Sequence, residues 1–383
     1  MLGRLTGWHS GGRVPDHVPY CRAMPRRSAT MLASTMLLIA MFCAALLINV
    51  PYSEMSPGPT FNTLGSQGGQ QVITISGRKT YPTSGNLNMV TVEVTNANYR
   101  MNLVEAVSGW LRHAVAVVPS STLYPSGQTE QQSEQEDAEE FTASQDSAKT
   151  SALKQLGIPV GTEVVVSAVV ADSPSVGKLH AGDTIVAVDG TKVGGDPTQV
   201  ATLVQKHQPG QDVVFTVIPP GKSASDAQQV GVVTGSYPKN SGQPDMSGKA
   251  YVGIEPGTEH TFPFNININL GDVGGPSAGL MFSLGIIDKL QSTNLTDGKF
   301  VAGTGTIDDN GVVGPIGGIS MKMIAARKAG AQYFFTPASN CSEAASATPS
   351  GLRLIKVTTL SGALTDLGDI RSGDLAALPS CGT

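Results

Sequence analysis

The chain has 383 residues, of which 40% are hydrophobic and 45 are glycine, which is enough apolar material for two or three domains. Its formal net charge of −5 argues against a broad basic surface of the kind that binds nucleic acid. The charge is uneven, because residues 1–29 contain five arginines against one aspartate. We therefore treat 1–29 as a separate basic tail.

An uncharged stretch of twenty residues, 31–50 (MLASTMLLIAMFCAALLINV), follows the basic tail. A helix of this length rises about 30 Å, the thickness of the hydrocarbon core of a bilayer. We predict a transmembrane helix at 30–50, with the arginine-rich tail in the cytoplasm and all later residues outside. The alternative is a cleaved signal peptide, but its apolar run would usually be shorter, and no A-x-A site follows here. Met24 is an alternative start of the chain, because it opens a compact basic flank by itself.

A β-rich segment is predicted at 51–125, because residues such as 87–94 (LNMVTVEV) alternate in the manner of a half-buried strand. Within it, residues 102–118 have helical spacing of apolar side chains. The next segment, 126–157, is acidic. We expect its first half to be a solvated, mobile insert and its second half, from 138 to 156, to be a helix.

Residues 158–221 predict the next compact unit, with short β-branched strands, a hairpin at Asp189-Gly190 and one helix. The stretch 179–190 (LHAGDTIVAVDG) resembles the L-x-x-G-D-x-I-x-x-V-x-G sequence of bacterial PDZ domains. That resemblance implies a groove that takes an extended peptide as an added strand. Gly157-Ile158 and Gly161 are candidates for the loop that binds the peptide carboxylate. A small β-rich spacer is the alternative.

A stretch rich in Gly, Pro, Ser and Lys, 222–248, is typical of a linker, and it separates the PDZ-like unit from a last domain at 249–370 with a tail at 371–383. Of the four cysteines, Cys341 and Cys381 fall in segments expected outside the membrane, where disulfides persist. We predict that these two pair, and the alternative is two free thiols. The cysteines form no metal-binding pattern, and we expect no metal and no cofactor.

Ser277 is the first candidate catalytic residue, and it lies in the sequence GGPSAG at 274–279. The residues from 278 to 287 (AGLMFSLGII) are almost all apolar, so we expect Ser277 at the N-terminal end of a buried helix. Unpaired N–H groups and the positive end of the helix dipole stabilise an oxyanion there, and Gly274 and Gly275 would let a substrate carbonyl come close. The alternative is a serine that only caps the helix.

Lys322 is the second candidate catalytic residue, and it lies in the sequence PIGGISMK. Residues 320–329 predict a helix that ends at Gly330, and the residues three, four and seven positions after Lys322 are all alanine. Lys322 therefore lies on the small apolar face, which packs inward. Burial disfavours the charged form of a lysine, and a neutral lysine beside a serine is a general base. The alternative is a lysine that extends past the alanines into solvent.

Together, GGPSAG, PIGGISMK and the intervening GTGT at 303–306 resemble the Ser/Lys proteolytic domain of the Lon protease family. The resemblance implies that Ser277 attacks the scissile carbonyl, that Lys322 accepts its proton and that Thr304 supports the lysine. Position 306 is usually acidic in Lon and is threonine here, so we expect no role for it.

The whole layout, with Pro57-Gly58-Pro59-Thr60 and Asn62-Thr63-Leu64-Gly65 after the membrane segment, is similar to the membrane-anchored, PDZ-containing Lon-like proteins of Gram-positive bacteria. The resemblance implies an α+β fold, a homo-oligomer that is hexameric, and a serine endopeptidase that cleaves extended or unfolded polypeptides outside the cytoplasmic membrane. The G-x-x-x-x-G-K-[ST] motif does not occur, so cleavage is expected to need no ATP. The alternatives are a non-catalytic PDZ scaffold at the membrane, a Ser-His-Asp triad that uses His260, and a phosphate-binding module on the glycine-rich loop, which lacks the lysine and threonine it would need.

Overall fold

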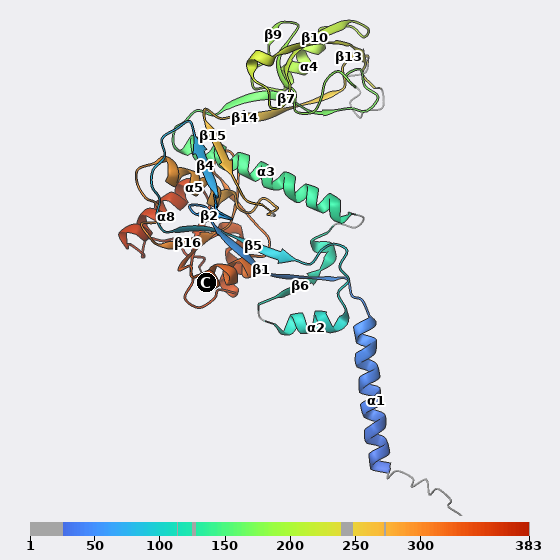
Figure 1. The fold of residues 1–383 in the computed structure, drawn as a ribbon, viewed down its shortest axis with the longest axis vertical. Coiled ribbons are helices and arrows are strands. Elements are labelled where there is room, and N and C mark those ends of the chain that lie inside the picture. Colours follow the sequence, from blue (N-terminus) through green and yellow to red (C-terminus); the bar gives the residue numbers. More distant parts are fainter. Residues whose placement is uncertain (1–25, 113, 125–127, 239–247, 272, 383) are drawn as a thin grey trace, which may run out of the picture.

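The computed structural model describes residues 26–112, 114–124, 128–238, 248–271 and 273–382. Most of the predicted basic tail, with Cys21 and Met24, lies outside the described residues. From bottom to top, Figure 1 shows a single projecting helix, a body of sheet and helices, and a small β domain. The body contains both helices and strands in irregular order, and the predicted α+β class is confirmed.

The projecting helix is α1 (Arg26–Leu47), which contains the predicted membrane segment. Residues 27–47 are long and apolar enough to cross a membrane, and none of this stretch is buried by the rest of the chain. The helix ends three residues earlier than the predicted segment. The reason is that Asn49 pairs with Asn102, and the Val50 N–H donates to the Met101 carbonyl at 2.9 Å, which draws the chain into the body.

The body is organised around one six-stranded sheet. Its strands run in the order β20 (Arg353–Val357), β19 (Tyr333–Pro337), β16 (Phe300–Gly303), β5 (Asn86–Val94), β1 (Tyr52–Asn62) and β6 (Ala116–Pro119). The first four strands are mutually parallel, and β1 is antiparallel to both of its neighbours.

This sheet contradicts the predicted boundary between a β-rich segment at 51–125 and a separate domain at 249–370. Because β5 pairs with β16 in parallel, with Asn86 opposite Phe300, the two segments share one sheet and one core. A second link is the antiparallel pair β4 (Ile73–Ser76) and β15 (Asn265–Ile268). The body is therefore assembled from both ends of the chain.

Helices cover both faces of the sheet. On one face lie α3 (Glu130–Gln155), α5 (Gly279–Leu290) and α8 (Leu360–Ser372), and on the other lie α6 (Ile319–Ala329) and α7 (Cys341–Ser346). Successive side chains of a strand point to opposite faces of the sheet. Val301 therefore packs in the core beneath α3, α5 and α8, and the adjacent Ala302 packs in the core beneath α6 and α7. A disulfide between Cys341 and Cys381 ties the end of the chain to α7, as predicted.

Helix α3 begins eight residues earlier than the predicted helix at 138–156. The prediction of a mobile insert before that helix is therefore wrong for the described residues from 128 onward. The helix begins at Glu130, because the Thr129 side chain accepts from the Gln132 N–H while the Gln132 side chain accepts from the Thr129 N–H. The helix then packs on α5, where the rings of Phe141 and Phe282 meet edge-to-face at 5.8 Å. Glu134, Glu136, Glu139 and Glu140 are exposed on the solvent-facing side of the helix.

The small β domain has its own sheet and core. Its strands run in the order β11 (Gln228–Val233), β10 (Asp212–Ile218), β8 (Thr184–Val188), β7 (Gly161–Val169) and β14 (Ile254–Thr261), with β9 (Thr191–Lys192) on β8 and α4 (Thr198–Val204) against the core. Two predicted boundaries fail here. Strand β11 lies within the expected linker, and β14 lies within the expected last domain, because each pairs with a strand of this sheet. Residues 239–247 of that linker lie outside the described part.

The remaining elements are short. They are α2 (Leu103–Leu111), the strands β2 (Ser66–Gln67), β3 (Gln70–Gln71), β12 (Gly235–Ser236), β13 (Ala250–Tyr251), β17 (Thr306–Ile307) and β18 (Val313–Gly314), and the 3-10 turns at Ser120–Thr122, Ala224–Asp226 and Ala338–Asn340. Helix α2 is shorter than the predicted 102–118, because the chain turns extended at Arg112 and then pairs as β6 with β1.

Candidate active site

Ser277 lies in the loop that leads into α5. The helix begins at Gly279 with Ala278 as its N-cap, so Ser277 precedes the helix rather than opening it. Its carbonyl accepts two hydrogen bonds at 2.9 Å, from the Gly305 N–H and from the Thr304 hydroxyl. Since a Cβ at Gly279 would come within 2.8 Å of an Ile307 methyl, only glycine allows the loop to lie this close to β17. The Ser277 loop is thus fixed by hydrogen bonds to the Ser277 carbonyl and by the close packing of Gly279 against β17.

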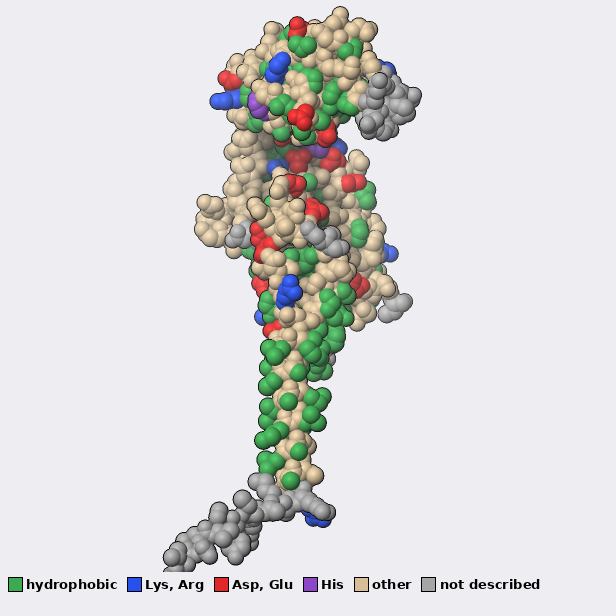
Figure 2. All heavy atoms as spheres, turned by 90° about the vertical axis from the view of Figure 1, so that its right-hand side faces the viewer, with side chains coloured by type: hydrophobic (Ala, Val, Ile, Leu, Met, Phe, Trp, Pro, Cys, Tyr) green, Lys and Arg blue, Asp and Glu red, His purple; other side chains and the backbone are tan. Residues whose placement is uncertain are grey.

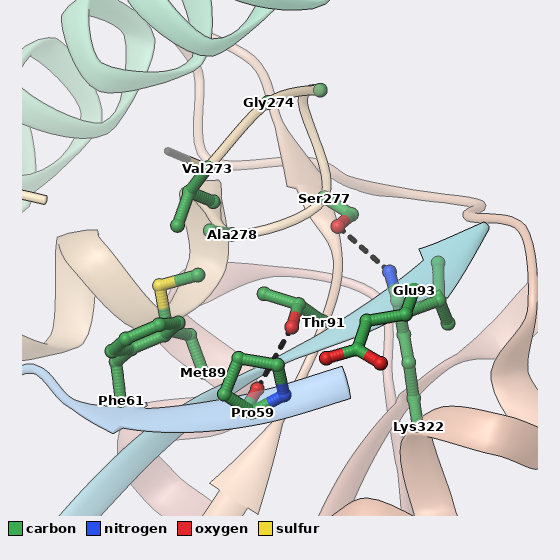
Figure 3. A pocket seen from close by; sticks show the side chains of 12 residues that line it. Pro59, Phe61, Met89, Thr91, Glu93, Val273, Gly274, Ser277, Ala278 and Lys322 are labelled. Atoms are coloured by element: carbon green, nitrogen blue, oxygen red, sulfur yellow. Dashed lines mark hydrogen bonds between the residues drawn. The ribbon is translucent and has the colours of Figure 1, made fainter. Parts of the chain in front are cut away.

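Lys322 enters the site from α6, on the opposite face of the sheet from α5. The residue is 3% exposed, and its Nζ lies 2.7 Å from the Ser277 Oγ (Figure 3). The same Nζ lies 3.3 Å from the Thr304 Oγ1. Gly318 is the N-cap of α6, and its φ of 67° favours glycine. The structure therefore brings together the three residues that the sequence singled out, from positions up to 45 residues apart.

Burial changes the acidity of this lysine. Removal from water lowers the pKa of Lys322 from 10.5 to about 8, because the charged ammonium loses hydration and gains no compensating partner charge. At neutral pH a useful fraction of the amine is then unprotonated. A neutral amine at 2.7 Å from a hydroxyl can accept its proton, which is what a general base does.

Thr304 joins the two catalytic candidates. It is fully buried at the end of β16, and its hydroxyl donates to the Ser277 carbonyl while accepting from Lys322 Nζ. One hydroxyl thus fixes both the loop and the amine. This arrangement suits the supporting role that the resemblance implied for Thr304.

A cleft of about 230 Å³ opens beside the Ser277 hydroxyl. Figure 3 shows the apolar side chains of Phe61, Met89, Val273 and Ala278 on one side of it and Glu93 near Lys322 on the other. Most of the remaining wall comes from β1 and β5. The sequence patterns did not indicate these wall residues, because they lie nearly 200 positions before the serine. The stretch at 57–60, which supported the family resemblance, was the one available signal.

The predicted oxyanion glycines line the cleft beside Ser277, and they also face α3. The Gly275 N–H donates to the Asp137 carbonyl of α3 at 2.9 Å, so it is not available to a substrate oxygen in this conformation. A Cβ at Gly274 would come within 2.7 Å of the Asp137 side chain. Because Ser144 also donates to the Pro276 carbonyl at 2.9 Å, the glycines here allow α3 to pack on the loop. For Gly275, the prediction of an oxyanion donor is not supported.

His260 does not take part in this site. Its Nδ1 lies 2.6 Å from an Asp146 oxygen, and its Nε2 lies 3.1 Å from an Asp309 oxygen. Both ring nitrogens are therefore engaged by carboxylates, and neither contacts Ser277. The alternative of a Ser-His-Asp triad has no geometric support.

Comparison with known proteins assigns both domains. Residues 132–225 match the model of the PDZ domain family, and residues 252–367 match that of the Lon protease (S16) C-terminal proteolytic domain. Taken together, the two matches support a PDZ-containing Lon-like protease. The PDZ match of this Lon-like chain starts within α3, so it includes the helix that holds the Ser277 loop.

Among curated proteins, the Lon-like chain is similar to a Lon protease from Chloroflexus aggregans, with 32% identity over 154 residues. That match covers 39% of this chain and 18% of the relative, so the Lon-like chain spans less than a fifth of that protein's length.

Two solved structures also match parts of the chain. One is a solution structure of a protein from Geobacillus thermodenitrificans, with 27% identity, covering 22% of this chain and 87% of that one, at a TM-score of 0.18. The other is the crystal structure of the PDZ domain of an SdrC-like protein from Listeria monocytogenes, with 23% identity, covering 24% and 84%, at a TM-score of 0.20. TM-scores this low add nothing to the fold assignment.

Proposed function

We propose that this protein is a serine endopeptidase that uses Ser277 as nucleophile and Lys322 as general base, with Thr304 positioning both. The observation that carries the proposal is the 2.7 Å contact between the serine hydroxyl and a buried amine whose pKa falls to about 8. A solvated lysine would hold its proton near neutral pH and could not act as a base.

The proposed reaction follows from these positions. The Ser277 proton passes to Lys322 Nζ as Oγ attacks the scissile carbonyl carbon, and a tetrahedral intermediate forms. Lys322, now an ammonium, gives that proton to the departing amine, which leaves an ester on Ser277. A water molecule then loses a proton to Lys322 and attacks the ester, and Lys322 returns that proton to the Ser277 Oγ as the second product leaves. Thr304 keeps the amine directed at Ser277 throughout.

The substrate is proposed to be an extended or unfolded polypeptide. In the described sheet, β6 pairs with β1 only from Tyr52 to Met55, so the part of β1 beside the cleft pairs on one side. An added peptide strand would run along that edge. The apolar walls at Phe61, Met89 and Val273 favour an apolar side chain next to the cleaved bond.

The cellular setting is also a proposal. The apolar length of α1 and the arginines before it support a single membrane anchor, with the N-terminus in the cytoplasm and the cleft outside. The lack of a G-x-x-x-x-G-K-[ST] motif within the 383 residues supports cleavage without ATP. By resemblance, a hexameric assembly is included in the proposal.

The test is cleavage of casein or a fluorogenic apolar peptide by the full chain in detergent, without ATP, beside Ser277→Ala and Lys322→Ala. We expect cleavage by the natural chain alone. Equal cleavage by all three proteins would refute the dyad. No cleavage by any of them, with peptide still bound by the PDZ domain, would favour the scaffold alternative.

A further inference from the structure

Helix α2 (Leu103–Leu111) lies directly where α1 leaves the proposed membrane span. The Leu103 N–H donates to the Ile48 carbonyl at 3.0 Å, one residue beyond the end of α1. In Figure 1, α2 lies beside the upper end of α1 and runs across its direction. If α1 spans a bilayer, α2 therefore sits at the level of the lipid headgroups.

The two faces of α2 differ strongly. Ala106 and Gly109 are buried against the body, and a Cβ at Gly109 would collide with Val117 of β6, so this face fits closely. The opposite face carries Val107, Trp110 and Leu111, which are exposed, with Leu111 at 76%. A helix nine residues long would not leave three large apolar side chains in water without a reason.

Trp110 is fixed in its exposed position. Its indole N–H donates to the Val117 carbonyl at 3.4 Å, and its ring meets Tyr52 edge-to-face at 5.5 Å, yet 55% of the residue remains exposed. Tryptophan and tyrosine are the residues that concentrate at membrane–water interfaces, because the ring is apolar and the polar atom stays hydrated.

The apolar surface continues without a break from α1. Figure 2 shows hydrophobic side chains along α1 and on the part of the body just above it. Leu47 and Ile48, at the end of the span, are both exposed and lead into the Trp110 face. The basic residue Arg100 lies just before α2, where it can meet lipid phosphates, while Arg112, just after α2, pairs with Glu54 at 2.7 Å.

We propose that α2 lies at the membrane–water interface on the outer side of the bilayer that α1 spans, with Val107, Trp110 and Leu111 inserted among lipid acyl chains. The proteolytic body then rests on the lipid surface. This inference rests on the proposed membrane anchor. The partner of this apolar face of α2 is lipid rather than a second copy of the chain, because the face is continuous with the membrane span α1 and lies where the chain leaves it. The body is then held at one height and one orientation above the bilayer.

The test uses the tryptophan itself. The sequence has two tryptophans, so Trp8→Phe leaves Trp110 as the sole emitter in the full chain. This variant is reconstituted in phosphatidylcholine–phosphatidylglycerol vesicles whose acyl chains carry bromine either near the headgroup or near the bilayer centre. We expect blue-shifted emission and about twofold or greater quenching by the shallow bromine, with weaker quenching by the deep one.

The control moves the tryptophan away from the membrane. Trp8→Phe with Trp110→Phe and Val176→Trp places the emitter at a PDZ-domain position that is also 55% exposed, and we expect no quenching there. Vesicle flotation separates the two proposals. A chain that floats while Trp110 stays unquenched overturns the α2 inference and leaves the anchor intact. The same holds if the Trp110 emission is blue but loses its blue shift on dilution into excess lipid, because Trp110 then contacts a second copy of the chain. A chain that does not float overturns the anchor and the inference together.

Discussion

Two polar clusters in this protein contain the residue types of proteolytic enzymes, and they differ in their surroundings. Ser277, Thr304 and Lys322 meet in the buried centre of the body. His260 lies between Asp146 and Asp309, where the side chains are 21%, 35% and 36% exposed. The second cluster joins α3, β14 and the loop after β17, so it fastens the PDZ sheet to the body.

The difference shows that environment, rather than residue type, decides which group becomes a base. Lys322 is an ordinary cation in water, but burial without an opposite charge lowers its pKa to about 8. Histidine is the usual base beside a catalytic serine, yet both nitrogens of His260 are bound to carboxylates and cannot receive the proton of a hydroxyl.

The largest effect expected from this comparison is the loss of either dyad residue. Ser277→Ala and Lys322→Met should each lower kcat/KM about 10³-fold or more, because the nucleophile or its base is removed. Lys328→Met, on the exposed side of the same helix, serves as the matched control and should stay within about twofold. Steady-state cleavage of an apolar peptide measures both. Residual activity above a tenth in Ser277→Ala would exclude it as the nucleophile.

The pH dependence of kcat/KM should distinguish the Lys322 cluster from the His260 cluster. Only the unprotonated form of Lys322 is active, so kcat/KM should rise about tenfold per pH unit up to about 8 and then level off. The profile of His260→Gln should be superimposable, since that residue accepts no proton from Ser277. A profile that is flat from pH 6 to 9, or that changes with His260→Gln, contradicts the assignment of the base.

Thr304 should have a smaller effect. Thr304→Val removes the hydroxyl that bonds the Ser277 carbonyl and Lys322 Nζ, and we expect about a tenfold or greater loss of kcat. The loss of a hydrogen bond to the ammonium should also lower the apparent pKa of the profile. Thr304→Ser keeps the hydroxyl and should restore most of the activity. Equal losses in both variants would mean that Thr304 acts through packing only.

Stability should change in the direction opposite to activity. Because the pKa of Lys322 falls from 10.5 unfolded to about 8 folded, the unfolded state binds more protons between those pH values, and stability rises with pH across that window. At pH 7 the buried lysine therefore costs about 3 kcal/mol. Lys322→Met should raise the Tm at pH 7, with a gain that shrinks toward pH 10, in thermal unfolding of the full chain in detergent.

His260→Gln provides the contrast in the same unfolding experiment. Its ion pairs are partly solvated, so the loss should be about 1 kcal/mol or less. If His260→Gln lowered the free energy of unfolding by more than Lys322→Met raised it, the expected ranking of the two clusters by their effect on stability would be wrong.

The contact between Ser277 and Lys322 could be predicted from sequence because each residue carries local information. The alanine face of α6 showed that Lys322 is buried, and the run after Ser277 showed that α5 is buried. The cleft walls could not be predicted, because the pairing of Asn86 with Phe300 depends on contacts more than 200 residues apart. The start of α3 was predictable in principle from Thr129 and Gln132, but composition obscured that capping pattern.

The division of the sheet between the two ends of the chain has a consequence for biosynthesis. Strands β1 and β5 are made early, but β16, which covers β5, follows more than 200 residues later. The PDZ sheet, made in between, has its strands from Gly161 to Thr261 and can close first. We expect chains truncated before residue 300 to show a protease-resistant PDZ fragment and no peptidase activity. A nascent chain therefore has no complete cleft until β16 and α6, which carries Lys322, have been synthesised.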